Sequence, residues 1–362
     1  MNALIFTGIF SNGGAERNAL IYALALKESG YSVTLVITRN QSISSNRQIS
    51  ENFGIRVIDF NSTKTIYTFF NSLFLLKKRK NFMLFVFSPE AQTLIGLISI
   101  FITIKGKIIT RNINTLSKIF SLNNFNQTYF FFYSYLLRRV YNISALILNQ
   151  SRGMHEDFIK LFPSYRNNSS VLYNALSKDK EYSQKINLTD CRNFIICAGR
   201  LTYQKRFDHA IKAFKLLSDR VYYDLYIFGD GEERKNLEEL VFNLGISSRV
   251  KFFGNVSNLS NYLVNARVLI LTSRYEGFPN IILDSLKFGT PVVSYDCESG
   301  PSELIIDGVN GFLVPNSDIK QLANQILRAL IYDWNYNYIP KTVDTYRFEA
   351  FKESLNKLLI GI

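Results

Sequence analysis

This sequence of 362 residues contains few histidines and cysteines, and its first half contains few acidic residues. It holds two histidines and three cysteines, and the three cysteines, Cys191, Cys197 and Cys297, follow no metal-ligand spacing. This pattern disfavours a disulfide scaffold or a zinc ribbon and is typical of a reduced, cytosolic protein. The sequence also lacks an Asp-x-Asp motif. It therefore offers no obvious carboxylate pair to hold a divalent metal over a pyrophosphate, and we expect no metal and no other cofactor.

Apolar runs long enough to span a bilayer are missing as well. The most apolar stretch, Ala91–Ile104, has 14 residues, whereas a spanning helix needs about 20, so we expect a buried helix. Ile119–Leu137 carries no charge, is rich in aromatic residues and is followed by Arg138-Arg139. It fits either a core helix or a helix lying on a membrane surface. The first residues, Met1–Phe6, lack the basic start and cleavage site of a secretory signal, so we expect a cytoplasmic protein.

The net charge of +13 is unevenly placed. Residues 1–185 hold 22 Lys and Arg against nine Asp and Glu, whereas residues 186–362 hold 20 of each kind. A basic half attracts an anionic partner such as nucleic acid, an acidic membrane surface or a phosphorylated lipid, although a solvated basic surface is the simpler alternative. No recognisable nucleic-acid-binding module is present, so we expect no nucleic acid partner.

Short apolar or β-branched runs alternate with longer helical patterns, once over residues 2–173 and again over residues 193–331. Two such βαβ series predict an α/β protein with two doubly wound, Rossmann-like domains. We place the first domain at 1–175, a polar linker at 176–192 and the second domain at 193–340. A last helical pattern, 345–362, is expected to pack back on the first domain. Ligands of such sheets bind beyond the carboxyl ends of the strands, so the residues after each strand carry the functional candidates.

Two cations follow the first strand of the second series. Arg200 and Lys205 lie in the segment that begins at Gly199, and fixed cations there can hold a diphosphate and stabilise its charge as it leaves. A solvated pair of charges is the alternative. The Gly229-Asp230-Gly231 turn after the next strand is a weak signal by itself, because a helix start with two glutamates explains it equally well.

Glu276 and Asp284 form the most informative constellation. Glu276 follows a strand, and Asp284 lies about a turn and a half into the next helix, whose first turn suits Pro279. Two carboxylates placed in this way can serve different parts of one elongated ligand, for example by accepting hydrogen bonds from sugar or ribose hydroxyls. A helix-start charge is the alternative for Glu276.

Glycine-rich turns follow two further strands. The turn with Gly300, Ser302 and Glu303 presents backbone amides that suit a phosphate, and residues 306–314 are expected to form a tight hairpin turn. The first loop of the chain contains Gly13-Gly14-Ala15-Glu16 and opens a helix, which favours an anion. It lacks the spacing of a dinucleotide fingerprint, and a plain strand-to-helix turn is the alternative.

In order and spacing, these residues resemble the retaining glycosyltransferases of family 4, which have the GT-B fold. The resemblance covers nearly the whole chain and is strongest over Ile195–Val314. It rests on an ordered set of segments: Gly13-Gly14-Ala15-Glu16, Tyr173-Asn174, Gly199-Arg200-Leu201 with Lys205, Gly229-Asp230-Gly231, Glu276-Gly277-Phe278-Pro279 and Gly308-Val309-Asn310-Gly311-Phe312. It implies two Rossmann-like domains that face a central cleft.

The resemblance also implies a role for each matched residue. Arg200 and Lys205 would bind the donor diphosphate, Glu276 would contact the donor sugar, and these three would form the catalytic set. Asp284 stands where the family has glutamate in its E-x7-E pattern, and this acid would hold the ribose with a side chain one methylene shorter. The remaining residues fall into two groups: Gly14, Gly199, Gly231, Gly300, Ser302 and Glu303 on the donor side, and Glu16, Arg111 and Asn112 on the acceptor side.

The implied reaction moves a sugar from a nucleotide-diphosphate sugar, expected to be a UDP-sugar, to an acceptor hydroxyl with retention of configuration. The acceptor would be a lipid-linked or other membrane-associated glycan in O-antigen, capsule or lipopolysaccharide synthesis. The basic first domain would then contact an anionic inner membrane peripherally, through Lys77-Lys78-Arg79-Lys80 and Arg138-Arg139. The alternatives are a GT-B-like sugar-nucleotide epimerase, an inverting transferase and a non-catalytic sugar-nucleotide-binding subunit.

Overall fold

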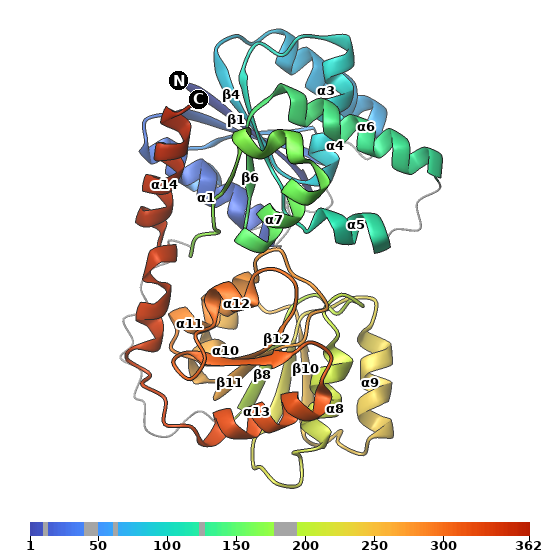
Figure 1. Ribbon diagram of the computed structural model, residues 1–362, viewed down its shortest axis with the longest axis vertical. Coiled ribbons are helices and arrows are strands. Elements are labelled where there is room, and N and C mark those ends of the chain that lie inside the picture. The colour runs from blue at the N-terminus through green and yellow to red at the C-terminus, as the bar shows by residue number, and fades with distance from the viewer. Residues whose placement is uncertain (10–13, 40–49, 61–63, 123–126, 177–193) are drawn as a thin grey trace. The chain divides into compact units, whose positions relative to one another are not determined.

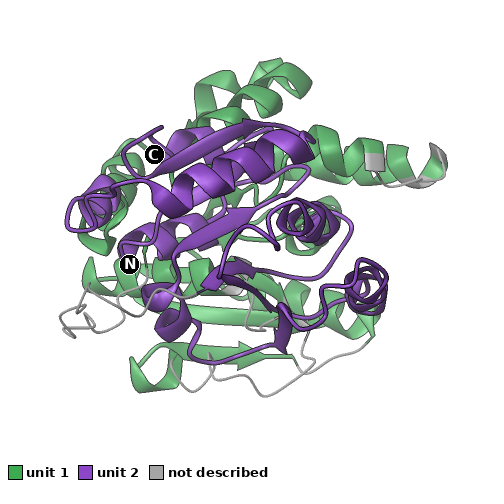
Figure 2. Ribbon diagram, turned by 90° about the horizontal axis from the view of Figure 1, so that it is seen from below, with its two compact units in different colours: residues 1–178, 346–362 green, residues 179–345 purple. Residues whose placement is uncertain are grey.

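Strands and helices alternate along the chain and build two parallel β-sheets (Figure 1). The computed structural model describes all residues except 10–13, 40–49, 61–63, 123–126 and 177–193. The chain divides into unit 1, residues 1–178 and 346–362, and unit 2, residues 179–345 (Figure 2). The predicted linker, residues 176–192, falls almost entirely outside the described residues.

The sheet of unit 1 has the strand order β3-β2-β1-β4-β5-β6-β7. Its strands are β1 (Asn2–Ile9), β2 (Ser32–Arg39), β3 (Arg56–Asp59), β4 (Phe82–Val86), β5 (Lys107–Arg111), β6 (Ser144–Asn149) and β7 (Ser169–Val171). All neighbours pair in parallel, and β1 pairs with both β2 and β4. The strand order therefore reverses direction between β1 and β4, as in a doubly wound sheet.

Successive residues of a strand point to opposite faces of the sheet, and in unit 1 both faces are buried. Ala3 and Ile5 belong to a core cluster that also contains residues of the first and last helices, whereas Leu4 and Phe6 belong to a second cluster. The helices of unit 1 are α1 (Gly14–Glu28), α3 (Thr65–Lys77), α4 (Pro89–Phe101), α5 (Leu116–Leu122), α6 (Gln127–Ile143), α7 (Arg152–Leu161), the 3-10 helix η1 (Pro163–Asn168) and α14 (Phe348–Ile360).

The last helix of the chain, α14, packs against the first, α1, so the two ends of the sequence meet in unit 1 (Figure 1). The rings of Tyr22 and Phe351 lie edge to face with centroids 4.8 Å apart. At the surface, Lys352 Nζ lies 2.9 Å from Glu28 Oε2. The buried aromatic pair supplies most of this contact energy, because an exposed ion pair contributes little.

The sheet of unit 2 has the order β10-β9-β8-β11-β12-β13. Its strands are β8 (Phe194–Ala198), β9 (Asp224–Phe228), β10 (Val250–Gly254), β11 (Val268–Leu271), β12 (Val292–Asp296) and β13 (Gly311–Pro315). Its helices are α8 (Phe207–Lys215), α9 (Arg234–Asn243), α10 (Leu259–Asn265), α11 (Asn280–Lys287), α12 (Pro301–Leu304) and α13 (Ile319–Ile331); the 3-10 helix η2 (Ile339–Tyr346) leads back to unit 1. This is again the order of a doubly wound sheet, with its reversal between β8 and β11.

Two expectations about apolar and turn segments have clear outcomes. Residues 91–104 fall largely in α4, whose inner face is buried, as predicted. Across the described ranges, no helix combines the length and hydropathy needed to cross a bilayer. The hairpin predicted for residues 306–314 is wrong, because β13 enters the sheet parallel to β12 instead of folding back antiparallel on a neighbour. The turn at Gly308–Asn310 leads into that strand.

Candidate functional site

The strand order of unit 2 selects one point of its sheet as the place for a ligand. The order reverses between β8 and β11, and ligands of doubly wound sheets bind at this switch point, beyond the carboxyl ends of the strands. Lys205 lies in the loop after β8, and Glu276 lies in the loop after β11. The two residues are 71 positions apart in the sequence, and the fold brings them together at the switch point.

Lys205 and Glu276 form an ion pair with little exposure to solvent. Lys205 Nζ donates a hydrogen bond of 2.6 Å to Glu276 Oε1, and the two side chains are 19% and 7% exposed. Ser273 Oγ donates to the same oxygen at 2.6 Å. Two charge-assisted hydrogen bonds on one oxygen fix the orientation of the carboxylate. Removal of one charged partner would leave the other charge poorly compensated in a site with little solvent. Such a change strongly lowers the stability of the folded protein.

The loop that carries Lys205 is tied to the loop that carries Glu276 by backbone groups. Thr272 Oγ1 donates to the carbonyl oxygens of Lys205 at 3.1 Å and Arg206 at 2.8 Å. The backbone N–H of Arg274 donates to the carbonyl of Gln204 at 2.9 Å, and Gln204 Nε2 donates to the carbonyl of Tyr275 at 3.0 Å. These bonds hold the backbone of both loops, so the position of the ion pair is set by the fold.

Glycines allow the loops after β8 and β9 to approach each other closely. A Cβ atom at Gly229, where φ is +116°, would lie 1.9 Å from the carbonyl oxygen of Gly199. A Cβ atom at Gly231 would lie 2.4 Å from the carbonyl oxygen of Leu201. Real Cβ atoms do not approach backbone oxygens so closely, so a side chain at either position would displace the loop that leads to Lys205. Gly229 and Gly231 therefore shape this loop, and Gly231 is one of the residues predicted on the donor side.

The loop after β12 is joined to the Glu276 segment in a similar way. The backbone N–H of Glu276 donates to the carbonyl of Glu298 at 3.2 Å. Gly300 has a φ of +99°, and a Cβ atom there would lie 2.5 Å from Cδ of Pro279. Two further predicted donor-side residues follow on α12, where Ser302 is exposed and Glu303 is half-buried. The turn at Gly300 thus lies against the segment that follows Glu276.

Arg200 and Asp284 complete the predicted set in unit 2. Arg200 is exposed just beyond the end of β8. Burial raises the pKa of the neighbouring Tyr275, with a smaller contribution from Glu276, whereas the charge of Arg200 opposes the shift. Arg200 is therefore close enough for its charge to act on Tyr275, the residue before Glu276. Asp284 is half-buried on α11, one helix turn beyond the start of that helix.

In unit 1 the structure places two predicted acceptor-side residues in the interior. Arg111 is 1% exposed, and its guanidinium lies over the ring of Tyr22 with its carbon 4.6 Å from the centroid. It donates a hydrogen bond to the side chain of Asn174, and burial lowers its pKa. Asn112 is 2% exposed and accepts a hydrogen bond of 2.9 Å from Tyr141 OH. These groups shape the carboxyl edge of the sheet from inside.

The buried network around Arg111 contains residues that the sequence analysis did not single out. Gln92 Nε2 donates to the carbonyl of Arg111 at 2.8 Å, and Asn112 Nδ2 donates to Asn149 Oδ1 at 3.0 Å. Single amides carry no spacing signal, so sequence patterns could not reveal them. Of the first loop, Gly14 is exposed at the start of α1; the side chain of Glu16 and residues 10–13 lie outside what the structure describes.

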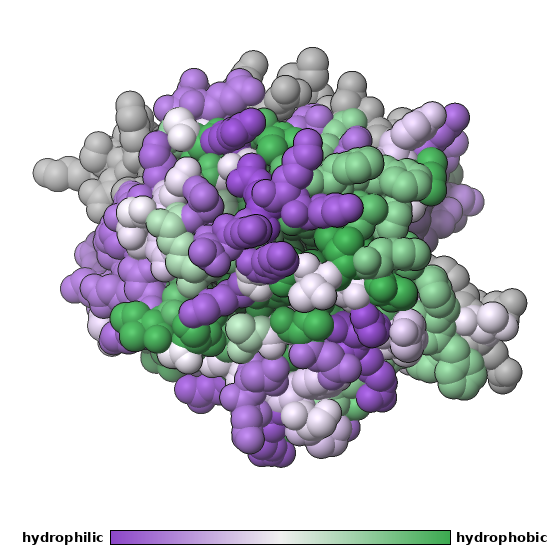
Figure 3. Space-filling model, turned by 90° about the horizontal axis from the view of Figure 1, so that it is seen from above, coloured by the Kyte–Doolittle hydropathy of each residue, from purple (hydrophilic) through white to green (hydrophobic). Residues whose placement is uncertain are grey.

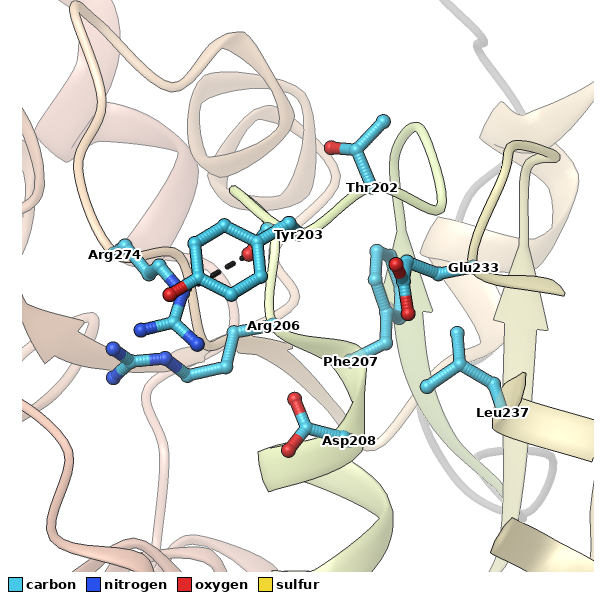
Figure 4. Close-up of a pocket in the computed structure, with 8 residues that line it drawn as sticks. All are labelled: Thr202, Tyr203, Arg206, Phe207, Asp208, Glu233, Leu237 and Arg274. Atoms are coloured by element: carbon cyan, nitrogen blue, oxygen red, sulfur yellow. Dashed lines mark hydrogen bonds between the residues drawn. The ribbon is translucent and has the colours of Figure 1, made fainter. Parts of the chain in front are cut away.

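A cavity of about 260 Å³ lies on another side of the loop that carries Lys205 (Figure 4). Its lining comes from the end of this loop, from the first turns of α8 and α9 and from Arg274: Thr202, Tyr203, Arg206, Phe207, Asp208, Glu233, Leu237 and Arg274. The guanidinium of Arg274 stacks on the ring of Tyr203 at 3.8 Å, and its Nε donates to the carbonyl of Tyr203. None of the residues predicted for the donor site lines this cavity.

His209, on α8, gives unit 2 a pH-dependent stability. Its Nδ1 lies 2.9 Å from Tyr295 OH, and burial, partly opposed by Asp208, lowers its pKa from 6.5 to about 4. The neutral ring is favoured in the folded state. Its full contribution is thus present above pH 6.5 and is lost as the pH falls from 6.5 towards 4. We expect His209→Gln to reduce the loss of stability over this range by on the order of 1 kcal/mol, as measured by urea unfolding at pH 7.5 and pH 4.5. Identical pH slopes for both proteins would contradict this assignment.

Comparison with solved structures identifies the fold class. The two doubly wound sheets match the structure of lipopolysaccharide outer core galactosyltransferase WaaB with a TM-score of 0.72 and 18% identity, over 99% of both chains. They match Anabaena HepE in complex with UDP-glucose with a TM-score of 0.80 and 19% identity, over the full length of both chains. The chain therefore has the fold of the GT-B glycosyltransferases.

Sequence comparison finds a family match in the second half of the chain. Residues 178–337 match the family described as glycosyl transferases group 1. The chain is 29% identical over 250 residues to N-acetylgalactosamine-N,N'-diacetylbacillosaminyl-diphospho-undecaprenol 4-alpha-N-acetylgalactosaminyltransferase of Campylobacter jejuni, covering 68% of this chain and 66% of that protein. It is 39% identical over 132 residues to the lipopolysaccharide core biosynthesis glycosyltransferase LpsE of Rhizobium meliloti, covering 36% and 38%. The chain thus spans less than two thirds of the length of each of these relatives.

Proposed function

We propose that this protein is a retaining glycosyltransferase that transfers a sugar from a UDP-sugar to a lipid-linked or other glycan acceptor. The observation that carries the proposal is the Lys205–Glu276 pair at the switch point of the unit 2 sheet, within the residues that match glycosyl transferases group 1. The names of the relatives, which include an undecaprenol-linked acceptor and lipopolysaccharide core synthesis, support a role in the synthesis of surface polysaccharide such as O-antigen, capsule or lipopolysaccharide.

In this proposal the donor changes the partners of the ion pair. Lys205, with Arg200, would take the diphosphate, since two fixed cations stabilise the charge that develops as the nucleotide leaves. Glu276 would then accept hydrogen bonds from hydroxyls of the transferred sugar, held in place by Ser273. Asp284 would hold the ribose. Because Lys205 and Glu276 neutralise each other in the ligand-free protein, the pair keeps both groups in place until the donor arrives.

In this proposal, unit 1 provides the acceptor side of the site and the contact with the membrane. Arg111 and Asn112 would act there as positioning residues, since both are buried. The protein would lie on the cytoplasmic face of the membrane, with the exposed Lys77, Lys78 and Lys80 near anionic head groups. Arg139, predicted for the same contact, donates to the carbonyl of Ser99 at 2.7 Å and is half-buried, so Arg138 is the better placed of that pair.

A transfer assay tests the proposal. The purified protein would be incubated with a panel of UDP-sugars and polyprenyl-diphosphate-linked acceptors, and released UDP and elongated glycan would be measured by mass spectrometry. We expect one UDP-sugar to give product with a retained anomeric configuration by NMR. We also expect a rate in EDTA within about twofold of the rate in Mg²⁺, because the two cations replace a metal at the diphosphate.

Other outcomes of the same assay would contradict the proposal. Interconversion of the sugar nucleotide without acceptor would indicate an epimerase. Product with inverted configuration would indicate a different class of transferase. Binding of UDP-sugar without turnover with any acceptor would indicate a non-catalytic subunit.

A further inference from the structure

Helix α3 buries Leu76 together with two small polar residues, and it exposes four large apolar residues on its outer side. Ile66, Tyr67, Phe70 and Phe74 are 55%, 58%, 45% and 58% exposed. On the opposite side, the hydroxyl residues Thr68 and Ser72 are 8% and 0% exposed. A helix on the surface of a globular protein normally carries polar or charged residues on its outer side. The outward apolar stripe therefore needs an explanation other than packing within unit 1.

The end of α4 extends the apolar surface of α3. Phe101 and Ile100 are 64% and 45% exposed at the last turn of α4. The ring of Phe69 lies 5.6 Å from that of Phe101 and 5.4 Å from that of Phe70, measured between centroids, so the two helices meet through their aromatic residues. We call the exposed set the aromatic face: Ile66, Tyr67, Phe70, Phe74, Ile100 and Phe101. A contiguous apolar surface of this kind marks a contact with another body.

The charged residues on and next to α3 are all positive. Residues 64–80 hold five Lys and Arg and no Asp or Glu. Helix α3 runs directly into Lys77-Lys78-Arg79-Lys80, of which three are exposed and Arg79 is half-buried. The view from above shows one side of the molecule, on which hydrophobic and strongly hydrophilic areas adjoin (Figure 3). A partner that binds this face must therefore offer both an apolar surface and negative charges.

We propose that the aromatic face docks on an anionic phospholipid bilayer. Ile66, Phe70, Phe74 and Phe101 would enter the boundary between head groups and acyl chains, and the lysines after α3 would contact the lipid phosphates. A second copy of the chain fits less well, because it would bring two sets of lysines together. The inference rests on the proposed function for the reason to be at a membrane, and it goes beyond that function by naming the inserting residues and the lipid.

Vesicle co-sedimentation tests this inference with the full chain. The vesicles would contain phosphatidylglycerol and phosphatidylcholine, or phosphatidylcholine alone. We expect binding to the anionic vesicles, at least tenfold weaker binding for the double variant Phe70→Ser/Phe74→Ser, and loss of the preference for anionic vesicles in Lys77→Gln/Lys78→Gln. The matched control is Phe242→Ser on α9 of unit 2, where a phenylalanine that is 75% exposed should be replaced without effect on binding.

Three results would overturn the inference. They are failure of the wild-type protein to bind anionic vesicles, equal binding by the wild-type protein and Phe70→Ser/Phe74→Ser, and a concentration-dependent dimer in sedimentation velocity that this variant abolishes without changing vesicle binding. The melting temperature of each variant with and without UDP would be measured in parallel. Because the aromatic face belongs to unit 1 and the donor candidates belong to unit 2, loss of the UDP response in every protein would speak against the proposed function, whereas the vesicle result would still decide the inference.

Discussion

Replacement of Glu276 by glutamine should lower the rate of sugar transfer by about 10²–10³-fold, the range seen when one preorganised group that acts on the transition state is removed. Glutamine keeps the shape of the side chain but loses the charge that faces Lys205 and the hydroxyls of the proposed donor sugar. The hydrogen bond from Ser273 at 2.6 Å would persist in a weaker, neutral form. Initial rates with saturating UDP-sugar give kcat, and rates at low UDP-sugar give kcat/KM.

The same variant should bind UDP at least as tightly as the wild-type protein. In the wild-type protein Lys205 Nζ must leave Glu276 Oε1 before it reaches a diphosphate, and in Glu276→Gln this competing charge is gone. Titration calorimetry with UDP measures this affinity. A loss of UDP affinity equal to the loss of transfer would contradict separate roles for the two residues, and it would indicate that Glu276 only maintains the fold of the loop.

Among Gly→Ala substitutions in unit 2, Gly229→Ala should cause the largest loss of stability. Its Cβ atom would lie 1.9 Å from the carbonyl oxygen of Gly199, and its backbone would remain at a φ of +116°. We expect a loss of at least about 3 kcal/mol of unfolding free energy, because backbone on both sides leaves no flexible side chain to move away. For a unit of this size, that loss is a fall in melting temperature of about 6 °C or more.

Gly245→Ala is the matched control for this prediction. Gly245 also has a positive φ, +67°, but a Cβ atom there meets nothing within 4 Å. It should therefore lose only the conformational term, about 1–2 kcal/mol, and keep the response to UDP. Differential scanning calorimetry would compare the two variants. Equal melting temperatures would show that the loops after β8 and β9 can separate at little cost, and that the close approach of Gly229 to Gly199 is unimportant.

The architecture could be predicted from the sequence because hydrophobic runs and helical periods dominate it. The alternation of short β-branched runs and longer helical patterns predicted the strands of both sheets. The loops after β8 and β11 stood out as candidates for a functional site because they follow buried strands. The hairpin predicted for residues 306–314 was wrong because a local turn pattern does not determine the direction of the next strand. A Gly-Val-Asn-Gly turn has the same local signal whether the next strand runs antiparallel to its neighbour or, as β13 does, parallel.

The contacts that assemble the site could not be predicted in the same way. Lys205 and Glu276 each stood out by position, but no local pattern indicates that Nζ of one meets Oε1 of the other across 71 residues. Ser273 and Thr272 hold the two loops through single hydroxyl groups, which have no spacing signature. Arg111 illustrates the opposite error, since a charged residue at a strand end is normally exposed, and here it is almost completely buried over the ring of Tyr22.

The melting temperature of the purified protein with UDP, GDP or NAD, compared with that of Lys205→Ala, tests the proposed donor site in unit 2 most directly. A ligand at 100 times its dissociation constant adds about 2.7 kcal/mol of stability, which a melting curve resolves. We predict a clear rise with UDP for the wild-type protein that disappears in Lys205→Ala. A rise with NAD alone, or a rise with UDP of the same size in both proteins, would contradict the assignment of Lys205 to the donor diphosphate.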